Sequence, residues 1–129
     1  MNPEDVISIG ANCILETRRN GFFLVVEIEA EAGNVEIEEY VFIRISRREA
    51  NAFLNAGVQR CQVVTSRPTS DNLEVNFVCV LILDREAFAL FDVEDDIDEA
   101  VLVEISLAEA RRLIRRGARQ CTVINRRLF

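Results

Sequence analysis

The feature that most constrains the fold of this chain is an internal repeat. Residues 41–64 align without a gap with residues 101–124, sixty positions further along the chain. Both stretches carry Ile-Ser-x-x-Glu-Ala, followed by a glycine and then a cysteine. The identical pairs are Val41/Val101, Ile45/Ile105, Ser46/Ser106, Glu49/Glu109, Ala50/Ala110, Gly57/Gly117, Cys61/Cys121 and Val63/Val123. This match predicts that one small structural unit is used twice.

The residues before each of these stretches also align, but at an offset of 66. The matching pairs are Asp5/Asp71, Cys13/Cys79, Leu15/Leu81, Arg19/Arg85, Phe22/Phe88 and Leu24/Leu90. The change of offset places six extra residues in the first copy, around Ala30–Glu36, where we expect a hairpin tip. The copies then run from about Asp5 to Arg67 and from about Asp71 to Arg127. We expect residues 1–129 to form a single compact domain made of these two repeats.

A short helix is predicted at the same place in each copy. Ser46–Glu49 and Ser106–Glu109 both have the sequence of a capping box, in which serine and glutamate each bond to the other's backbone. Gly57 and Gly117 stand where a left-handed residue ends a helix. One apolar face lies between these signals in each copy, made by Ala50, Phe53 and Leu54 in the first and by Ala110, Leu113 and Ile114 in the second.

Most of the remaining sequence alternates with a period of two, as β-strands do. Asn20-Gly21 and Ala32-Gly33-Asn34 are typical of tight turns between such strands. The predicted fold class is therefore α+β: a tandem duplication of a β-β-β-α-β unit, with two short helices. We expect mostly antiparallel sheets that form a barrel-like or sandwich-like domain with pseudo-two-fold symmetry.

The strands carry apolar residues on both faces, more than two short helices can cover. The residues of the second face are Phe23, Val25, Tyr40, Phe42, Val78, Val80, Ile82, Phe88, Leu90 and Leu102. Either the two copies close their sheets on each other, or one face meets another chain and forms an oligomer. The glutamates near the strand ends, from Glu27 to Glu39, are interpreted as solvated hairpin tips.

Catalytic and metal-binding patterns find little support in this sequence. The chain has no histidine, so a serine or cysteine nucleophile would need another base. Ser46 and Ser106 already have a role as helix caps. Asp92–Asp98 has acids at alternate positions, but Ile97 stands where a calcium loop needs glycine. We therefore predict no enzyme activity, no catalytic residue, no cofactor and no metal site.

Four cysteines stand singly, at Cys13, Cys61, Cys79 and Cys121, and no CxxC pair occurs. We interpret them as buried free thiols that act as small apolar residues. The acidic residues after Met1 do not resemble the basic start of a secretory signal, so we expect a cytoplasmic protein. No apolar run is long enough to span a membrane, and no membrane partner is expected.

Arginines gather in the predicted second helix, although the chain as a whole has a formal net charge of −7. The candidate interaction surface is Arg111, Arg112, Arg115, Arg116 and Arg119. The favoured interpretation is a solvated helix face that pairs with nearby carboxylates. A basic helix could instead bind nucleic-acid phosphates, or the basic helix of one chain could meet the acidic edge of another.

We therefore expect a non-enzymatic assembly or protein-interaction protein, whose partner is a second copy of itself in a homodimer or another protein. One alternative is a small-ligand binding module with a site between the two repeats. The other is nucleic-acid binding through the arginine-rich helix, which the net negative charge disfavours.

Overall fold

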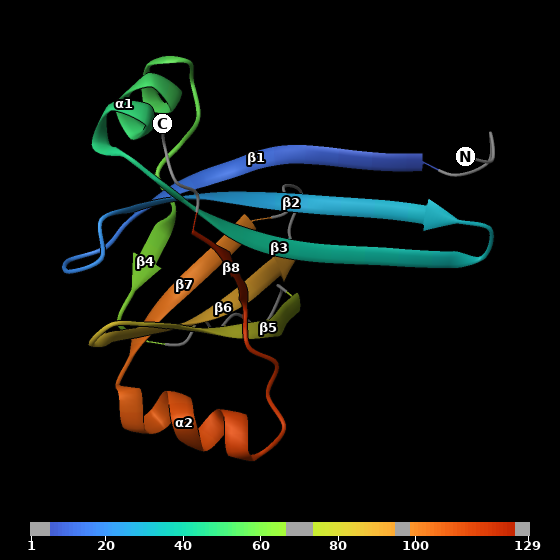
Figure 1. Cartoon of the computed structure of the whole chain (residues 1–129). Coiled ribbons are helices and arrows are strands. Elements are labelled where there is room, and N and C mark those ends of the chain that lie inside the picture. The colour runs from blue at the N-terminus through green and yellow to red at the C-terminus, as the bar shows by residue number, and fades with distance from the viewer. Residues whose placement is uncertain (1–5, 67–73, 95–98, 126–129) are drawn as a thin grey trace. The chain divides into compact units, whose positions relative to one another are not determined.

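The computed structural model describes residues 6–66, 74–94 and 99–125. In these residues the fold is α+β, with eight strands in two mixed four-stranded sheets and two helices (Figure 1). The α+β prediction is confirmed. Of the two expected arrangements, barrel-like and sandwich-like, the barrel is wrong, because in the described residues each sheet keeps two edge strands and does not pair its first strand with its last.

The chain divides into two compact units, the first formed by residues 6–16, 21–60 and 122–125. Its strands are β1 (Val6–Glu16), β2 (Phe22–Ala32), β3 (Val35–Ile45) and β8 (Thr122–Ile124), in the order β1-β2-β3-β8. The β1–β2 and β2–β3 pairs are antiparallel, whereas β3 and β8 are parallel. Helix α1 (Arg47–Asn55) packs on β1 and β2.

The second unit is formed by Thr17–Asn20 and Cys61–Cys121. Its strands are β4 (Gln62–Val64), β5 (Glu74–Leu83), β6 (Glu86–Glu94) and β7 (Glu99–Ile105), in the order β4-β7-β6-β5. The β4–β7 pair is parallel and the other two pairs are antiparallel. Helix α2 (Leu107–Arg115) packs on β5 and β6.

The predicted order of strand, strand, strand, helix and strand is found in both halves of the chain. The pairing of the two final strands, however, was not predicted. Strand β4 follows α1 in sequence but pairs with β7, and β8 follows α2 but pairs with β3. Each sheet is thus completed by the short last strand of the other half.

Strand register corrects one part of the repeat alignment. Phe23 pairs with Arg44, and Phe88 pairs with Glu104, which is the residue sixty positions after Arg44. Phe88 therefore occupies the strand position in the second unit that Phe23, and not Phe22, occupies in the first. Residues 22–26 and 87–91 are apolar at every position, so both alignments fit nearly as well and sequence similarity alone placed β6 one residue out of step.

The predicted capping interactions are all present at α1 and partly present at α2. At α1 the capping box is complete: the Glu49 N–H donates to the Ser46 hydroxyl, and the Ser46 N–H donates to the Glu49 carboxylate. At α2 only the serine half forms, through the Glu109 N–H. Both helices end before a glycine with positive φ, as predicted.

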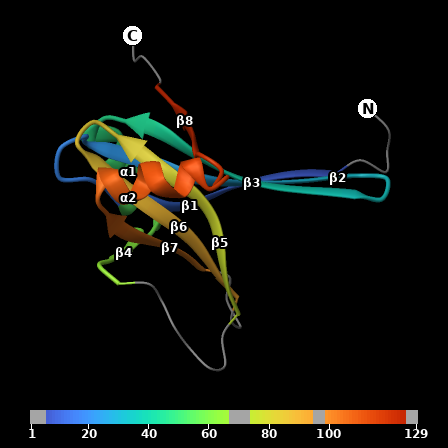
Figure 2. The ribbon, with the colours of Figure 1, turned by 90° about the horizontal axis from the view of Figure 1, so that it is seen from below.

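Each helix covers one face of its own sheet. Under α1 a buried core contains Ile14, Leu24, Val26, Ile45 and Ala50. The β2–β3 hairpin continues beyond the part of the sheet that α1 covers and turns at Gly33, where φ is +62° (Figures 1 and 2). The turn predicted at Ala32-Gly33-Asn34 is confirmed. Among the described residues, no helix has the length and apolar character that a membrane span requires.

Candidate functional site: an acidic hairpin and an arginine-rich helix

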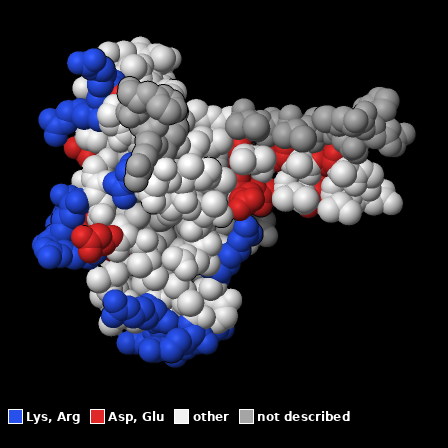
Figure 3. Space-filling model, viewed as in Figure 1, with Lys and Arg blue, Asp and Glu red and all other residues white. Residues whose placement is uncertain are grey.

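The part of the β2–β3 hairpin from Glu27 to Glu38, which includes the turn, has one acidic face. The register pairs Glu29 with Glu38 and Glu31 with Glu36 across the two strands, and Glu27 lies two residues before Glu29. Because alternate residues of a strand face the same side, all five carboxylates share one face. Figure 3 shows acidic side chains gathered along this hairpin. Like charges directly opposite each other destabilise a strand pair, so this arrangement is costly in the isolated chain.

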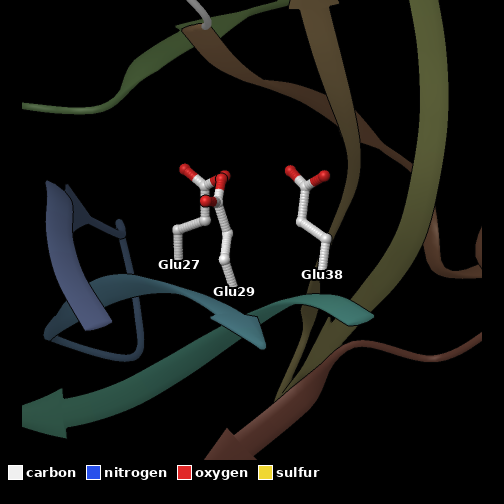
Figure 4. Close-up of side chains that lie close together, drawn as sticks. All are labelled: Glu27, Glu29 and Glu38. Atoms are coloured by element: carbon white, nitrogen blue, oxygen red, sulfur yellow. The ribbon is translucent and has the colours of Figure 1, made fainter. Parts of the chain in front are cut away.

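Three of these glutamates form a tight cluster. One carboxylate oxygen from each of Glu27, Glu29 and Glu38 lies within 4.8 Å of the others, and Figure 4 shows the three side chains rising from the same face of the hairpin. Glu27 is half-buried, while Glu29 and Glu38 are exposed. Hard divalent cations such as Ca²⁺ prefer carboxylate oxygens, so these are the residues that could hold a metal ion.

Crowding changes how these carboxyl groups titrate. Burial raises the pKa of Glu27 to about 8, with smaller contributions from hydrogen bonds and charge repulsion with Glu38 and Glu29. The hydrogen bond with Glu36, followed by repulsion from the same group, raises the pKa of Glu31. A cation beside the cluster would favour the charged carboxylates and reverse these shifts.

The sequence prediction described these glutamates as solvated hairpin tips and did not recognise them as a group. Most of them are exposed, as expected. The sequence signal that would have shown the group is the placement of glutamates at alternate positions on both sides of the turn. Glutamates at 27, 29 and 31, a two-residue turn at Gly33-Asn34, and glutamates at 36 and 38 must fall on one face of a hairpin.

The arginines predicted as an interaction surface all lie exposed on α2 or in the turns after it. They are Arg111, Arg112, Arg115, Arg116 and Arg119. Among the described residues, ion pairs at 3.6 Å and 2.6 Å join Arg18 to Glu104 and Arg60 to Glu16, and both pairs lie outside α2. Figure 3 shows basic side chains gathered at this helix. The candidate surfaces are therefore one crowded with carboxylates and one crowded with guanidinium groups.

The prediction of four free thiols is wrong. Cys79 and Cys121 form a disulfide with a Cα–Cα distance of 5.1 Å, and Cys13 and Cys61 are also disulfide-bonded. None of the four cysteines, which all lie in the described residues, is free. The predicted burial is correct for Cys13, Cys79 and Cys121, but the sequence did not reveal which sulfurs approach each other. The Cys121 N–H donates to the carbonyl of Val80, which brings Cys121 beside β5.

No family model, curated protein or solved structure matches this chain. The function therefore has to be argued from the surfaces themselves.

Proposed function

We propose that this chain is a non-enzymatic assembly protein that associates with copies of itself. The arginines of α2 in one chain bind the acidic face of the β2–β3 hairpin in another. The observation that carries this proposal is the set of five glutamates on one face of that hairpin, with two pairs directly opposed. Guanidinium groups bind carboxylates in bidentate fashion and would relieve the repulsion.

The other face of the hairpin adds an apolar contribution. Val35 and Ile37 are 58% and 55% exposed. Their strand positions place them opposite Ala32 and Ala30, on the side away from the glutamates. Burial of exposed apolar side chains stabilises association, whereas charge complementarity mainly directs it and accelerates it. A partner that contacts both faces would therefore gain affinity as well as orientation.

Two kinds of assembly follow from the same contact. If each chain gives its helix to the other's hairpin, the contact is reciprocal and closes a homodimer. If the contact is not reciprocal, each chain leaves one surface open and the assembly grows. Light scattering after size-exclusion chromatography distinguishes a dimer from a growing series of species.

Charge exchange is the direct test. The hairpin variant Glu29→Arg/Glu38→Arg and the helix variant Arg112→Glu/Arg116→Glu should each fail to self-associate. Mixed together, they should associate with each other, since each now carries the charge that the other lacks. Arg48→Glu, an exposed position on α1, is the matched control and should associate like the wild type. A wild-type chain that stays monomeric at low salt would sink the proposal.

Two other partners are tested by the same variants. If Ca²⁺ rather than arginine neutralises the hairpin, Glu29→Arg/Glu38→Arg should abolish calcium binding in calorimetry, while the helix variant leaves it unchanged. Nucleic-acid binding would show as retention of a DNA duplex at low salt that Arg112→Glu/Arg116→Glu removes. Either result, without self-association, would replace the assembly proposal.

Two further expectations belong to this proposal. We infer that the two halves are duplicated copies of one unit, an inference supported by their common element order and common serine caps.

Disulfides persist in oxidising compartments and in the cytoplasm of hyperthermophiles. We therefore propose a cytoplasmic location only for a cell of that kind. Alkylation of free thiols during cell lysis, followed by fractionation, tests both the disulfides and the location.

A further inference from the structure

The second unit contains a pocket of about 340 Å³ beside α2, a size typical of small-molecule sites. Its apolar lining includes Ala89, Phe91, Val103 and Leu113. Phe77 and Phe91 meet edge to face, with ring centroids 5.5 Å apart and an angle of 71° between the planes. The ionisable residues among its described lining are both acidic, Glu104 and Glu109.

Comparison with the first unit explains why this space is open. Strand register matches Ala87 to Phe22, because they pair with Ile105 and Ile45 respectively. By the same register Ala89 corresponds to Leu24. Two large apolar side chains that face α1 are therefore replaced by two alanines that face α2.

Phe91 stands at the position of Val26 and returns part of this volume, but the two units still pack differently. Under α1 the helix-facing residues form one continuous core that includes Leu24 and Val26. Under α2 the corresponding residues divide into two clusters, one with Ala87 and Ala110 and one with Ala89 and Phe91. Glu109 is exposed and Phe77 is 39% exposed, so this hollow opens to solvent and a small molecule could enter it.

The charges at the pocket indicate what kind of occupant suits it. The Glu104 carboxylate lies 3.6 Å from the Nε of Arg18, so it already has a positively charged partner. Glu49 in the first unit accepts the Ser46 N–H at 3.0 Å. Glu109 does not close the equivalent cap and is exposed at the pocket instead. It pairs with no arginine in the described part of the chain.

We infer that this pocket binds a small organic cation: a primary ammonium group joined to an aromatic or branched apolar body. The ammonium group would donate to the Glu109 carboxylate. The apolar body would occupy the space between Ala89, Val103 and Leu113, next to the two phenylalanine rings. Aromatic rings also attract cations, which adds to the preference for this charge. This ligand binding is separate from the proposed self-association and does not depend on it.

Three probes of matched shape test the inference: 2-phenylethylamine, which is protonated at neutral pH, 2-phenylethanol and 3-phenylpropanoate. The amine should bind most tightly in calorimetry, the alcohol more weakly, and the carboxylate least. Glu109→Gln should weaken amine binding about tenfold, the scale of a lost charge-assisted hydrogen bond, and leave alcohol binding nearly unchanged. Glu49→Gln, at the equivalent position of the first unit, is the matched control and should change neither.

Filling the pocket provides the second test. Ala89→Leu gives the second unit the residue that the first unit has at this position, so we expect a folded protein with an equal or higher melting temperature. It should abolish binding of both the amine and the alcohol. Amide shifts at Ala89, Phe91 and Leu113 should report the amine in the wild type. The inference is overturned if no probe binds at millimolar concentration, if the carboxylate binds as well as the amine, or if Ala89→Leu binds the amine normally.

Discussion

At the scale of single residues, the titration of Glu27 makes the stability of the folded chain depend on pH. Its pKa in the folded chain is about 8, against an ordinary value of 4.5. The folded state therefore holds an extra proton between these values, and the stability that the protonated group contributes is lost as pH rises from about 4.5 to about 8. Glu27→Gln should raise the denaturation midpoint at pH 8 and change it little at pH 4.5. Equal effects at both pH values would contradict the crowded geometry.

The two helix caps differ at the level of one hydrogen bond, although their sequences match. Glu49→Ala removes a carboxylate that accepts the Ser46 N–H, and should cost about 1 kcal/mol of unfolding free energy. Glu109→Ala removes no such bond and should cost less. Ser46→Ala and Ser106→Ala should each cost about 1 kcal/mol, because both hydroxyl groups cap a backbone N–H. Urea denaturation compares the four variants, and equal losses for both glutamates would show that α2 has a closed capping box in solution.

At the scale of elements, the short final strands make the sharpest prediction. Adjacent residues of a strand point their N–H groups to opposite sides, so two consecutive prolines must remove any donor that faces the neighbouring strand. Thr122→Pro/Val123→Pro should therefore reduce hydrogen-exchange protection in Val41–Ile43 of β3. Gln62→Pro/Val63→Pro should instead reduce protection in Val101–Val103 of β7.

The opposite pattern would be informative as well. If each final strand paired within its own half of the chain, the prolines in β4 would expose β3 and those in β8 would expose β7. Hydrogen exchange measured by residue-resolved NMR separates the two topologies, because it shows which of β3 and β7 loses more protection in each variant. Each double variant serves as the control for the other, since each introduces two prolines at corresponding positions.

Some features of these elements could be predicted from the sequence and others could not. Helix ends depend on local groups such as Ser46 and Gly57, and these were predicted correctly. Strand partners depend on contacts between distant residues, and the similar sequences of β3 and β7 make them nearly equivalent partners for β4 and β8. Alternation could have revealed the shared face of Glu27, Glu29 and Glu38. The pocket at Ala89 could not have been predicted before the register showed which residue of the first unit it replaces.

At the scale of the whole molecule, charge is unevenly distributed rather than simply negative. The formal net charge of −7 argued against a nucleic-acid partner, but it averages over an acidic hairpin and a basic helix. Raising the ionic strength from about 0.1 M to about 1 M shortens the screening length from about 10 Å to about 3 Å. Self-association through these surfaces should weaken over that range, as measured by light scattering. An association that strengthens with salt would indicate that apolar contacts such as Val35 and Ile37 dominate.

The disulfides constrain the chain as a whole, and their effect on stability is the last prediction. Cys79 and Cys121 are separated by 42 residues, so their bond closes a long loop and removes much of the freedom of the unfolded chain. Loss of such a cross-link typically costs about 2–4 kcal/mol. The double variant Cys79→Ala/Cys121→Ala should show a loss of this order in urea denaturation without reductant. With an excess of dithiothreitol, wild type and variant should converge, apart from the packing of the two substituted side chains. A thiol reagent added to the unfolded, unreduced wild type should find no reactive cysteine, and a reaction with all four would restore the free-thiol interpretation.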